Sequence, residues 1–405
     1  MSGALEGLRV LDLSRFISGP YCGMMLGDMG AEVIKIEKPG KGELVRSYEP
    51  ALGGNSLYAM VFNRNKKSLP IDLRKSEGQA LLRELVKHAD VLIENFRPGT
   101  MEKMGCSWET LHALNSRLIM ARISGFGQDG PYASLPCFDV IAQASSGLMD
   151  LTGEPDGPPM VIGTYICDYV TASYATIGIL GALQARERTG KGQLVDVALL
   201  DSAVSLLLTA IPERVRLGHR MTRRGNRDRY GPPTASYRTA DGDWVYITAG
   251  TMFHRFAQAI GRPELLNDSR FNSFAARIEH TSEVEQIAAD WIGARSTQEV
   301  LRTLQAADVP CAKVATIDDV IASPQLKHRG QIVEIEHPGA GKVPMQGVTI
   351  KLSDTPLEIK RPLPELGQDT EEVLRSWLGY GKDTIQALVE AQVVAAADGV
   401  VGNGG

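Results

Sequence analysis

The sequence predicts an α/β fold built on a mostly parallel sheet. Over about the first two hundred residues, short runs rich in β-branched residues alternate with helical stretches, a rhythm typical of a sheet whose faces are covered by helices. The chain of 405 residues is long enough for two or three structural units. Its composition, 43% hydrophobic and 22% charged, is that of an ordinary globular protein.

The predicted elements of the first part follow one another in alternation. Strands are expected over residues 9–13, 32–37, 90–94 and 118–124, and helices over 21–29 and 76–88. Gly30 marks the end of the first helix, and Ser76 is expected to cap the second. In parallel sheets ligands bind outside the carboxyl ends of the strands. The loops expected there are 14–18, 37–40, 95–99 and 124–130.

The composition changes over residues 214–233, where many arginines precede Gly-Pro-Pro, and this predicts a linker. A β-hairpin is expected over 235–249, turning at Asp241-Gly242. Further expected elements are helices over 252–260 and 281–306 (interrupted near 294–297), a β-rich stretch over 331–352 and a last helix over 370–377. The tail 399–405 is expected to be floppy.

Several classes of protein are disfavoured by composition. A net charge of −5 argues against a general nucleic-acid binder, and five scattered cysteines without CxxC spacing indicate neither a metal site nor a disulfide framework. No secretory signal is visible, and the most apolar helical candidate, residues 198–210, is too short to span a bilayer. A cytoplasmic location is therefore expected. The glycine-rich stretch 125–130 lacks the spacing of a nucleotide-binding loop.

Asp168 is the only charge in the apolar, small-residue run 163–178, and a helical pattern follows it. An ionised carboxylate is costly to desolvate, so it needs a partner at a helix start or a chemical role. The structural interpretation is that Asp168 caps the start of this helix, with Thr171 and Ser173 near the first turn. Cys167 is adjacent, but buried thiols are more often packed than reactive.

A series of motifs in one order identifies a family resemblance. They lie at 8–15, 19–20, 26–37, 63–68, 89–99, 124–131, 138–143 and 186–193. In this order they resemble the class III (CaiB/BaiF, formyl-CoA transferase-like) coenzyme A transferases, and Asp168 falls where that family carries its catalytic aspartate. Many ordered matches are far more specific than a single short motif.

The resemblance implies an architecture. A large Rossmann-like domain with a parallel sheet is built from both ends of the chain, a small α+β domain is inserted between them, and two subunits interlock as a homodimer. The expected boundaries are 1–215 for the first part of the large CoA-binding domain, 216–233 for a linker, 234–327 for the small domain, and 328–405 for the return linker and the rest of the large domain. For the basic run 214–229, a solvated linker remains the alternative to an inter-domain crossing.

The resemblance also implies a transferase with covalent catalysis. CoA passes from an acyl-CoA, such as succinyl-CoA, to a free carboxylic acid, and CoA is a substrate rather than a tightly bound cofactor. Asp168 attacks the thioester to give a mixed anhydride, and the released thiolate then forms an aspartyl-CoA thioester. The acceptor acid repeats these steps in reverse.

Residues for binding CoA are carried over position by position from the family. They are Ile17, Ser18, Lys38, Ile71, Asp72, Leu73, Arg74, Asn95, Phe96, Arg97, Lys103, Cys137, Phe138 and Asp139. Three positions depart from the formyl-CoA enzyme's pattern: Pro136 replaces a lysine, Ile17 replaces a glutamine, and segment 226–233 holds one glycine and two prolines in place of a glycine-rich loop.

Two other functions remain open at this point. An α-methylacyl-CoA racemase would need an acid/base histidine where this chain has Phe138. The second alternative is a CoA-binding subunit of a heteromeric transferase. The presence of Asp168 argues against a subunit without catalytic activity. The acceptor is expected to be a dicarboxylate, received by basic and aromatic residues of the middle stretch (Arg214, Arg216, Arg223, Arg224 and Tyr230), with an aryl-substituted acid as the main alternative and an oxalate-type acid below both.

Overall fold

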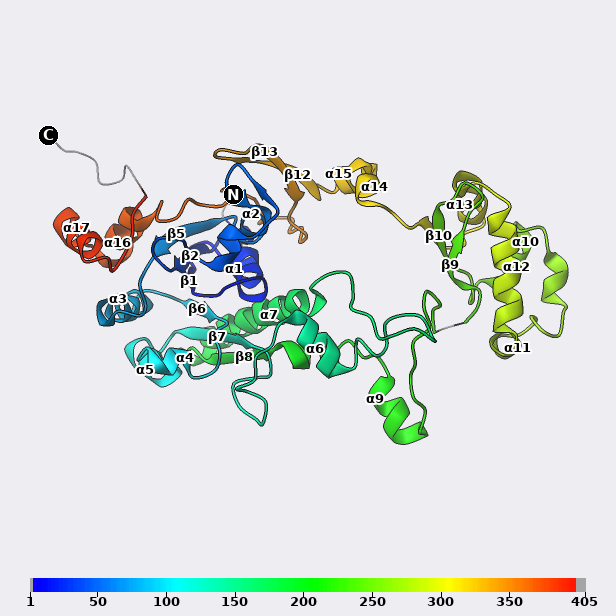
Figure 1. Ribbon diagram of the computed structural model, residues 1–405, viewed down its shortest axis with the longest axis horizontal. Helices are drawn as coiled ribbons and strands as arrows, with labels where there is room; N and C mark the ends of the chain where they lie inside the picture. The colour runs from blue at the N-terminus through cyan, green and yellow to red at the C-terminus, as the bar shows by residue number, and fades with distance from the viewer. Residues whose placement is uncertain (1–2, 230, 398–405) are drawn as a thin grey trace. The chain divides into compact units, whose positions relative to one another are not determined.

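The computed structural model describes residues 3–229 and 231–397, and the expected floppy tail 399–405 and Tyr230 lie outside them. The chain is divided into two compact units (Figure 1). The first is formed by Met1–Leu148, Ile162–Leu208 and Pro324–Gly405, and the second by Met149–Val161 and Thr209–Ser323.

A six-stranded parallel sheet forms the centre of the first unit, in the order β5-β2-β1-β6-β7-β8. Four strands match the predicted runs: β1 (Arg9–Asp12), β2 (Glu32–Glu37), β6 (Val91–Glu94) and β7 (Ile119–Ser124). The strands β5 (Lys66–Pro70) and β8 (Leu194–Ala198) were not predicted. The α/β class with a parallel sheet is confirmed.

Helices cover both faces of this sheet because alternate side chains of each strand point to opposite faces. On one face, Leu11, Ile34, Leu92 and Met120 belong to a core that includes side chains of four helices. These helices are α3 (Ser76–Val86), α5 (Trp108–Leu114), α16 (Thr370–Leu378) and α17 (Lys382–Glu390). Helices α1 (Ser18–Asp28) and α7 (Ile166–Thr189) pack against each other and against strands of the sheet.

Two local predictions in the first unit are wrong. The N-cap of α3 is Lys75, and the Ser76 hydroxyl donates to Glu77 and does not cap the helix. The helix α17 follows α16, so the expected last helix is not the last. The apolar stretch 198–210, which was expected to be too short to span a bilayer, contains the short helix α8 (Leu199–Val204), and at its end, in the second unit, α9 (Ala210–Pro212) begins.

Helix α7 is the one helix in the described part of the chain that is long and apolar enough to cross a membrane. Only 39% of its most apolar window is buried in this single chain. Core helices of soluble proteins meet the same criterion, so length and hydropathy alone are weak support for a membrane span.

The second unit is built on an antiparallel sheet of order β11-β10-β9. The predicted hairpin is confirmed as β9 (Thr234–Arg238) and β10 (Trp244–Thr248), with β11 (Cys311–Lys313) on its edge. The predicted helices are also present, as α10 (Phe253–Ala259), α12 (Thr281–Gly293) and α13 (Thr297–Ala306). The break between the last two is fixed by Ser296, whose hydroxyl caps α13.

The remaining elements are short. In the first unit they are β3 (Ala51–Leu52), β4 (Asn55–Ser56), α2 (Leu57–Phe62), α4 (Thr100–Lys103), α6 (Asp139–Ser146), α15 (Pro324–His328) and the hairpin β12 (Ile332–His337) and β13 (Gly341–Gln346). The hairpin lies within the predicted β-rich stretch 331–352. In the second unit they are α11 (Phe274–Glu279) and α14 (Ile317–Ala322), besides short helical turns.

The order of strands places a switch point between β1 and β6, from which the sheet grows in both directions. The loops that follow these two strands are joined by Arg15 and Asn95. The Arg15 N–H donates to Asn95 Oδ1 at 2.7 Å, and Asn95 Nδ2 donates to the Arg15 carbonyl at 2.7 Å. A crevice at such a point is where open α/β sheets bind ligands.

Candidate active site

Asp168 is the third residue of α7, and the N-cap of this helix is Tyr165. The interpretation of Asp168 as the cap is therefore wrong. Thr171 and Ser173 do not cap the helix either, because their hydroxyls donate to the carbonyls of Cys167 and Tyr169 one turn earlier. Instead, the Asp168 main-chain N–H donates to Asp139 Oδ2 at 3.0 Å.

Asp139 is itself held rigidly. It is the first residue of α6 and is buried, and its Oδ1 accepts a hydrogen bond of 2.5 Å from Gln143 Nε2. The amide oxygen of Gln143 accepts in turn from the Ile162 N–H at 3.0 Å. Helix α6 is thus joined to the segment that leads into α7 and to the first turn of α7.

The Asp168 side chain is half-buried. Burial and the neighbouring charge of Asp139 raise the pKa of Asp168 to about 7, while the influence of the Ser18 hydroxyl lowers it. A carboxyl with such a pKa, placed at a helix start beside a second acid, is a candidate for chemistry. Near neutral pH it is present partly as a poorly stabilised carboxylate.

Two thiols lie next to this carboxyl, and both are held protonated. Burial, with the charges of Asp168 and Asp139, raises the pKa of Cys137 to about 11. Burial, with the same two charges, raises the pKa of Cys167 to about 12. Because the thiolate is the reactive form, neither cysteine is activated as a nucleophile at neutral pH.

Gly125, the first residue after β7, allows the segment of Cys137 to approach. A Cβ atom at position 125 would lie 2.1 Å from the Cβ of Cys137, far inside any real contact. The glycine therefore brings the chain leading to Asp139 against the end of β7. This is a packing role.

An aromatic cluster surrounds the site, and we call Phe16, Tyr48, Tyr58, Phe138 and Tyr165 the aromatic rim. Its ring centroids are 5.5 Å apart for Phe16 and Phe138, 6.4 Å for Phe16 and Tyr48, and 6.5 Å for Tyr48 and Tyr58. The neighbouring Tyr58 phenol and burial raise the pKa of Tyr165. Phe138 is 60% exposed, so the rim is open to solvent. Of these residues sequence reasoning singled out only Phe138.

The residues carried over for CoA lie beyond the carboxyl ends of the strands. Asp139 is hydrogen-bonded to the Asp168 N–H, Ser18 influences the pKa of Asp168, and the charge of Asp168 influences the pKa of Cys137. The basic residues Lys38, Arg74, Arg97 and Lys103 are exposed in the loops after β2, β5 and β6 or in the short helix α4. Side chains of this type, in this place, are suited to phosphate groups.

Two of the carried-over segments have structural partners of their own. The Arg74 guanidinium donates to both carboxylate oxygens of Asp72, at 2.8 Å each, and Ile71 is buried in the core. The Phe96 ring lies 4.8 Å from the Arg15 guanidinium, which places an aromatic face and a cation at the switch point.

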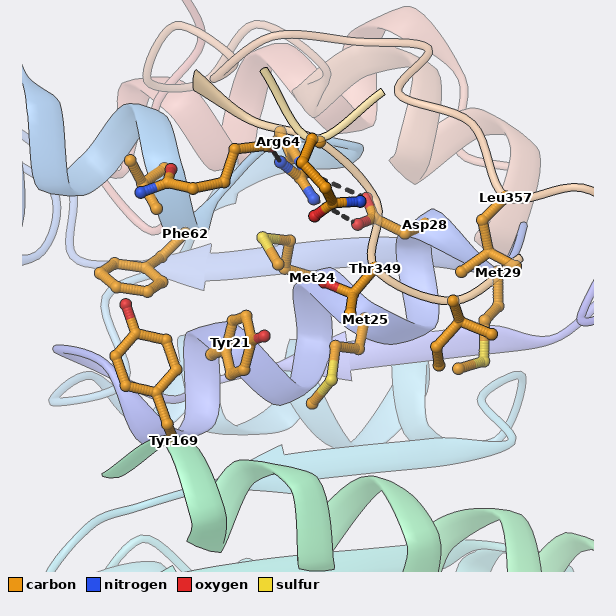
Figure 2. A pocket seen from close by; sticks show the side chains of 15 residues that line it. Tyr21, Met24, Met25, Asp28, Met29, Phe62, Arg64, Tyr169, Thr349 and Leu357 are labelled. Carbon is orange, nitrogen blue, oxygen red and sulfur yellow. Dashed lines mark hydrogen bonds and ion pairs between the residues drawn. The ribbon is translucent and has the colours of Figure 1, made fainter. Parts of the chain in front are cut away.

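A cavity of about 210 Å³ lies beside α1 (Figure 2). Figure 2 shows Tyr21, Phe62 and Tyr169 grouped at one end, three methionines (Met24, Met25 and Met29) along α1, and the ion pair of Arg64 and Asp28 above them. That pair is buried, with Nη2 of Arg64 2.6 Å from Oδ2 of Asp28. None of the carried-over site residues lines this cavity. One lining residue, Tyr169, directly follows Asp168 in the chain.

Comparison with known proteins assigns the family. The family model described as CoA-transferase family III matches residues 5–370. A CaiB/BaiF family protein from Brucella suis has a similar structure, with a TM-score of 0.83 and 34% identity over 93% of this chain and 100% of that one. Rv3272 from Mycobacterium tuberculosis has a TM-score of 0.82 and 29% identity over 91% of this chain and 99% of that one.

Curated relatives agree over nearly the whole length. The succinyl-CoA–D-citramalate CoA-transferase of Chloroflexus aurantiacus is 42% identical over 96% of this chain and 98% of its own. The β subunit of succinyl-CoA–L-malate CoA-transferase from the same organism is 38% identical over 96% and 98%. The formyl-CoA:oxalate CoA-transferase of Rhodopseudomonas palustris is 34% identical over 96% of each chain. The chain belongs to CoA-transferase family III and is a coenzyme A transferase.

Proposed function

We propose that this enzyme transfers CoA from succinyl-CoA, or a similar acyl-CoA, to a free carboxylic acid through covalent intermediates on Asp168. The observation that carries the proposal is the environment of that carboxyl. Asp168 lies on the first turn of an apolar helix, its main-chain N–H is held by Asp139, and burial and Asp139 raise the pKa of its carboxyl.

The chemistry follows from the carboxylate. One Asp168 oxygen attacks the thioester carbonyl, an O–C bond forms, and the C–S bond breaks to release CoA thiolate. The thiolate attacks the aspartyl side of the resulting anhydride, forms an aspartyl-CoA thioester and frees the donor acid. The acceptor carboxylate then attacks this thioester, and thiolate return onto the acceptor's acyl group restores Asp168.

The surroundings suit this sequence of steps. An anhydride is higher in free energy than a thioester, so binding energy from the long CoA molecule has to offset this difference. The aromatic rim supplies apolar surface that a bound acyl-CoA would cover, and this would limit access of water to the two hydrolysable intermediates. A carboxylate that is poorly stabilised in the resting enzyme is also a better nucleophile.

For CoA itself we propose the carried-over positions as contacts. Lys38, Arg97 and Lys103 are exposed cations at the binding edge and would face phosphates, with Arg74 already paired to Asp72. Ile17, Ser18, 71–74, 95–97 and 137–139 would line the path from the nucleotide to Asp168. CoA would be bound as a substrate, without a tightly held cofactor.

For the acceptor we propose a dicarboxylate. The support is the names of two relatives, which act with succinyl-CoA on D-citramalate and on L-malate. Of the middle-stretch arginines, Arg223 is engaged by Asp150, with Nη1 3.0 Å from Oδ1. Arg214, Arg216 and Arg224 are exposed cations suited to a second carboxylate.

For the assembly we propose an interlocked homodimer, with the second unit serving as the small domain and with boundaries near 215, 233 and 327. Exposed apolar residues support an interface: Tyr174 and Ile177 on α7, and Ile211, Val215 and Leu217 in the second unit. A pairing with a related second subunit is the alternative, since α and β subunits exist among the relatives. The proposed location is the cytoplasm.

A mass-spectrometric screen of succinyl-CoA against a panel of free acids tests the function. We expect new acyl-CoA products with dicarboxylates such as citramalate or malate. Asp168→Asn should lower turnover at least a thousandfold, whereas Asp383→Asn, an exposed first-turn acid on α17, should not change it. Turnover by the Asp168→Asn variant, or a quenched enzyme without label on Asp168 during turnover, would contradict the mechanism.

A further inference from the structure

We propose that Glu43 is a positioning residue of this transferase. By holding the main chain of Phe16, it fixes the Phe16 ring against Phe138 and so preserves the arrangement of the aromatic rim on which the acyl-CoA would pack. The inference rests on the proposed function, in which the intermediates on Asp168 have to be protected from water.

Glu43 is a buried acid in the loop after β2. It directly precedes a short 3₁₀ helix, Leu44–Ser47, and its carboxylate does not cap that helix. The Glu43 side chain is only 3% exposed. Its main-chain N–H donates to Glu37 Oε1 at 3.2 Å, and the Arg46 guanidinium holds both oxygens of Glu37, at 2.7 and 2.8 Å. Because desolvation of a carboxylate is costly, the Glu43 side chain needs donors of its own.

The two oxygens of Glu43 have different partners. Oε1 lies 3.5 Å from Nζ of Lys35 and accepts from Asn63 Nδ2 at 3.4 Å. Oε2 accepts from the main-chain N–H of Phe16 at 3.1 Å. One oxygen therefore contacts the buried polar groups, and the other holds the loop after β1. A hydrogen bond to a charged acceptor is stronger than one between neutral groups, so this contact is suited to fixing a backbone.

Phe16 has a backbone conformation that needs such a partner. Its φ is 65°, in the left-handed region that residues with a side chain rarely adopt. A conformation of this kind persists only when the surroundings fix it. Here Glu43 holds the N–H of Phe16, and Asn95 holds both the N–H and the carbonyl of the preceding residue, Arg15.

The buried cation beside Glu43 has further partners. Lys35 also donates to the Ser14 carbonyl, and its Nζ lies 3.8 Å from Asp12 Oδ1. Removing the charge of Glu43 would lower stability, because Lys35 would lose one of its two carboxylates. Lys35 would still keep Asp12 and the Ser14 carbonyl. The N–H of Phe16, in contrast, would lose the side chain that holds it.

The conformation of Phe16 decides where its ring lies. The ring stands edge-on to Phe138, with the two centroids 5.5 Å apart and the planes at 89°. Phe138 is directly followed by Asp139, whose Oδ2 accepts from the Asp168 N–H at 3.0 Å. Through this ring pair, Glu43 supports both the rim and the segment that holds the proposed nucleophile.

The rim would decide the fate of the covalent intermediates. When water attacks the aspartyl-CoA thioester, the C–S bond breaks, and the products are the restored Asp168 carboxylate, free CoA thiol and one proton. The acceptor carboxylate competes for the same carbonyl carbon. The ratio of hydrolysis to transfer therefore reports how well water is excluded. Without Glu43, Phe16 should relax to a negative φ, its ring should leave Phe138, and water should gain access.

The experiment measures this ratio by mass spectrometry in Glu43→Ala, Glu43→Gln and Phe16→Gly. For Glu43→Ala we expect a rise of about tenfold or more, since a displacement of about 1 Å can change a rate by about 10²-fold. Glu43→Gln keeps an oxygen that can accept from the Phe16 N–H, so it should recover most of the parent's ratio. Phe16→Gly tolerates the positive φ but lacks the ring, so it should raise the ratio while remaining folded.

Asp28→Asn is the matched control. Asp28 is also a buried acid, 2.6 Å from the Arg64 guanidinium, and it lines the cavity beside α1 instead of belonging to the rim. This variant should lose stability, as Glu43→Gln should, but keep the parent's ratio of hydrolysis to transfer. It separates a general loss of stability from a loss of rim positioning.

The double variant Glu43→Ala/Phe16→Gly tests the route of the effect. If Glu43 acts through Phe16, the double variant should have the same ratio as Phe16→Gly alone. Independent effects of the two changes would instead multiply.

A folded Glu43→Ala with the parent's ratio, or effects that multiply in the double variant, would overturn the role of Glu43. If Glu43→Ala does not fold, Phe16→Gly decides: the parent's ratio overturns the proposal, and a raised ratio supports it. In all these results an inactive Asp168→Asn leaves the proposed function standing. Turnover by Asp168→Asn would remove the proposed function itself.

Discussion

The main-chain N–H of Asp168 donates to the side chain of Asp139 at 3.0 Å, so one acid is positioned by the other. The bond orients the first turn of α7 and places a negative charge beside the Asp168 carboxyl. Asp139 therefore both positions Asp168 and adds to the effect of burial in raising its pKa.

Replacing Asp139 by Asn should separate these two effects. Asn keeps an oxygen that can accept from the Asp168 N–H but removes the charge that helps to raise the pKa of Asp168. The rising limb of kcat/KM, expected near the value of about 7, should therefore move to lower pH. A pH–rate series with a saturating acceptor measures the shift. A limb that moves upward, or stays in place, would contradict the assignment.

Asp168→Asn should change stability with pH in a defined direction. The pKa of Asp168 is raised to about 7, so its contribution to the unfolding free energy is complete below the ordinary value of 3.8 and is lost as pH rises through 7. The Asn variant has no carboxyl to titrate at this position, so its unfolding free energy does not change in this way with pH. Its stability relative to the parent should rise between pH 4 and 8 by on the order of 4 kcal/mol, at about 1.4 kcal/mol per pKa unit. Urea unfolding at several pH values checks this, and a constant difference would oppose it.

The buried pair of Arg64 and Asp28 should behave as a coupled unit. Removing one partner leaves an uncompensated buried charge, so Arg64→Met or Asp28→Leu should each cost about 3–5 kcal/mol. The double variant restores neutrality next to three methionines and should cost less than the two single changes together. Chemical denaturation of all four proteins measures the coupling. Strictly additive costs would show that the ion pair is unimportant.

Gly125 offers a test of site geometry through packing. Gly125→Ala puts a methyl group into Cys137 and should destabilise the protein by about 1–3 kcal/mol, as overpacking does. It should also lower kcat at least tenfold, because Cys137 leads to Asp139. Cys137→Gly removes the clashing atoms, so the double variant should recover activity. Failure of the double variant to exceed Gly125→Ala would show that the clash is not the cause.

Much of the fold is readable from the sequence because its signals are local. β1, β2, β6 and β7 are apolar runs between turn residues, and Asp241-Gly242 marks a tight turn. β5 was not predicted because it begins with two lysines. One of them, Lys66, is buried and bonded to Asp12 and Asn63, contacts that only the tertiary structure supplies. β8 is interrupted by Asp196 and lies at the sheet edge.

The site is only partly readable for the same reason. Asp168 stands out locally as a lone charge in an apolar run. Its partners do not, because Ser18, Asp139 and the aromatic rim come from separate segments that only the folded sheet brings together. The expectation of a helix cap was wrong because the helix begins earlier, with Tyr165 as its N-cap. Which side chains converge is a tertiary property that no local pattern encodes.

Helix α7 carries Asp168, the proposed nucleophile, on its first turn and exposes Tyr174 and Ile177 further along. At 1.5 Å of rise per residue, these side chains lie on the same helix within about 15 Å of Asp168 along its axis. If the proposed homodimer packs on them, the partner subunit would help to hold the helix that carries Asp168, and a free subunit would be less active than the dimer.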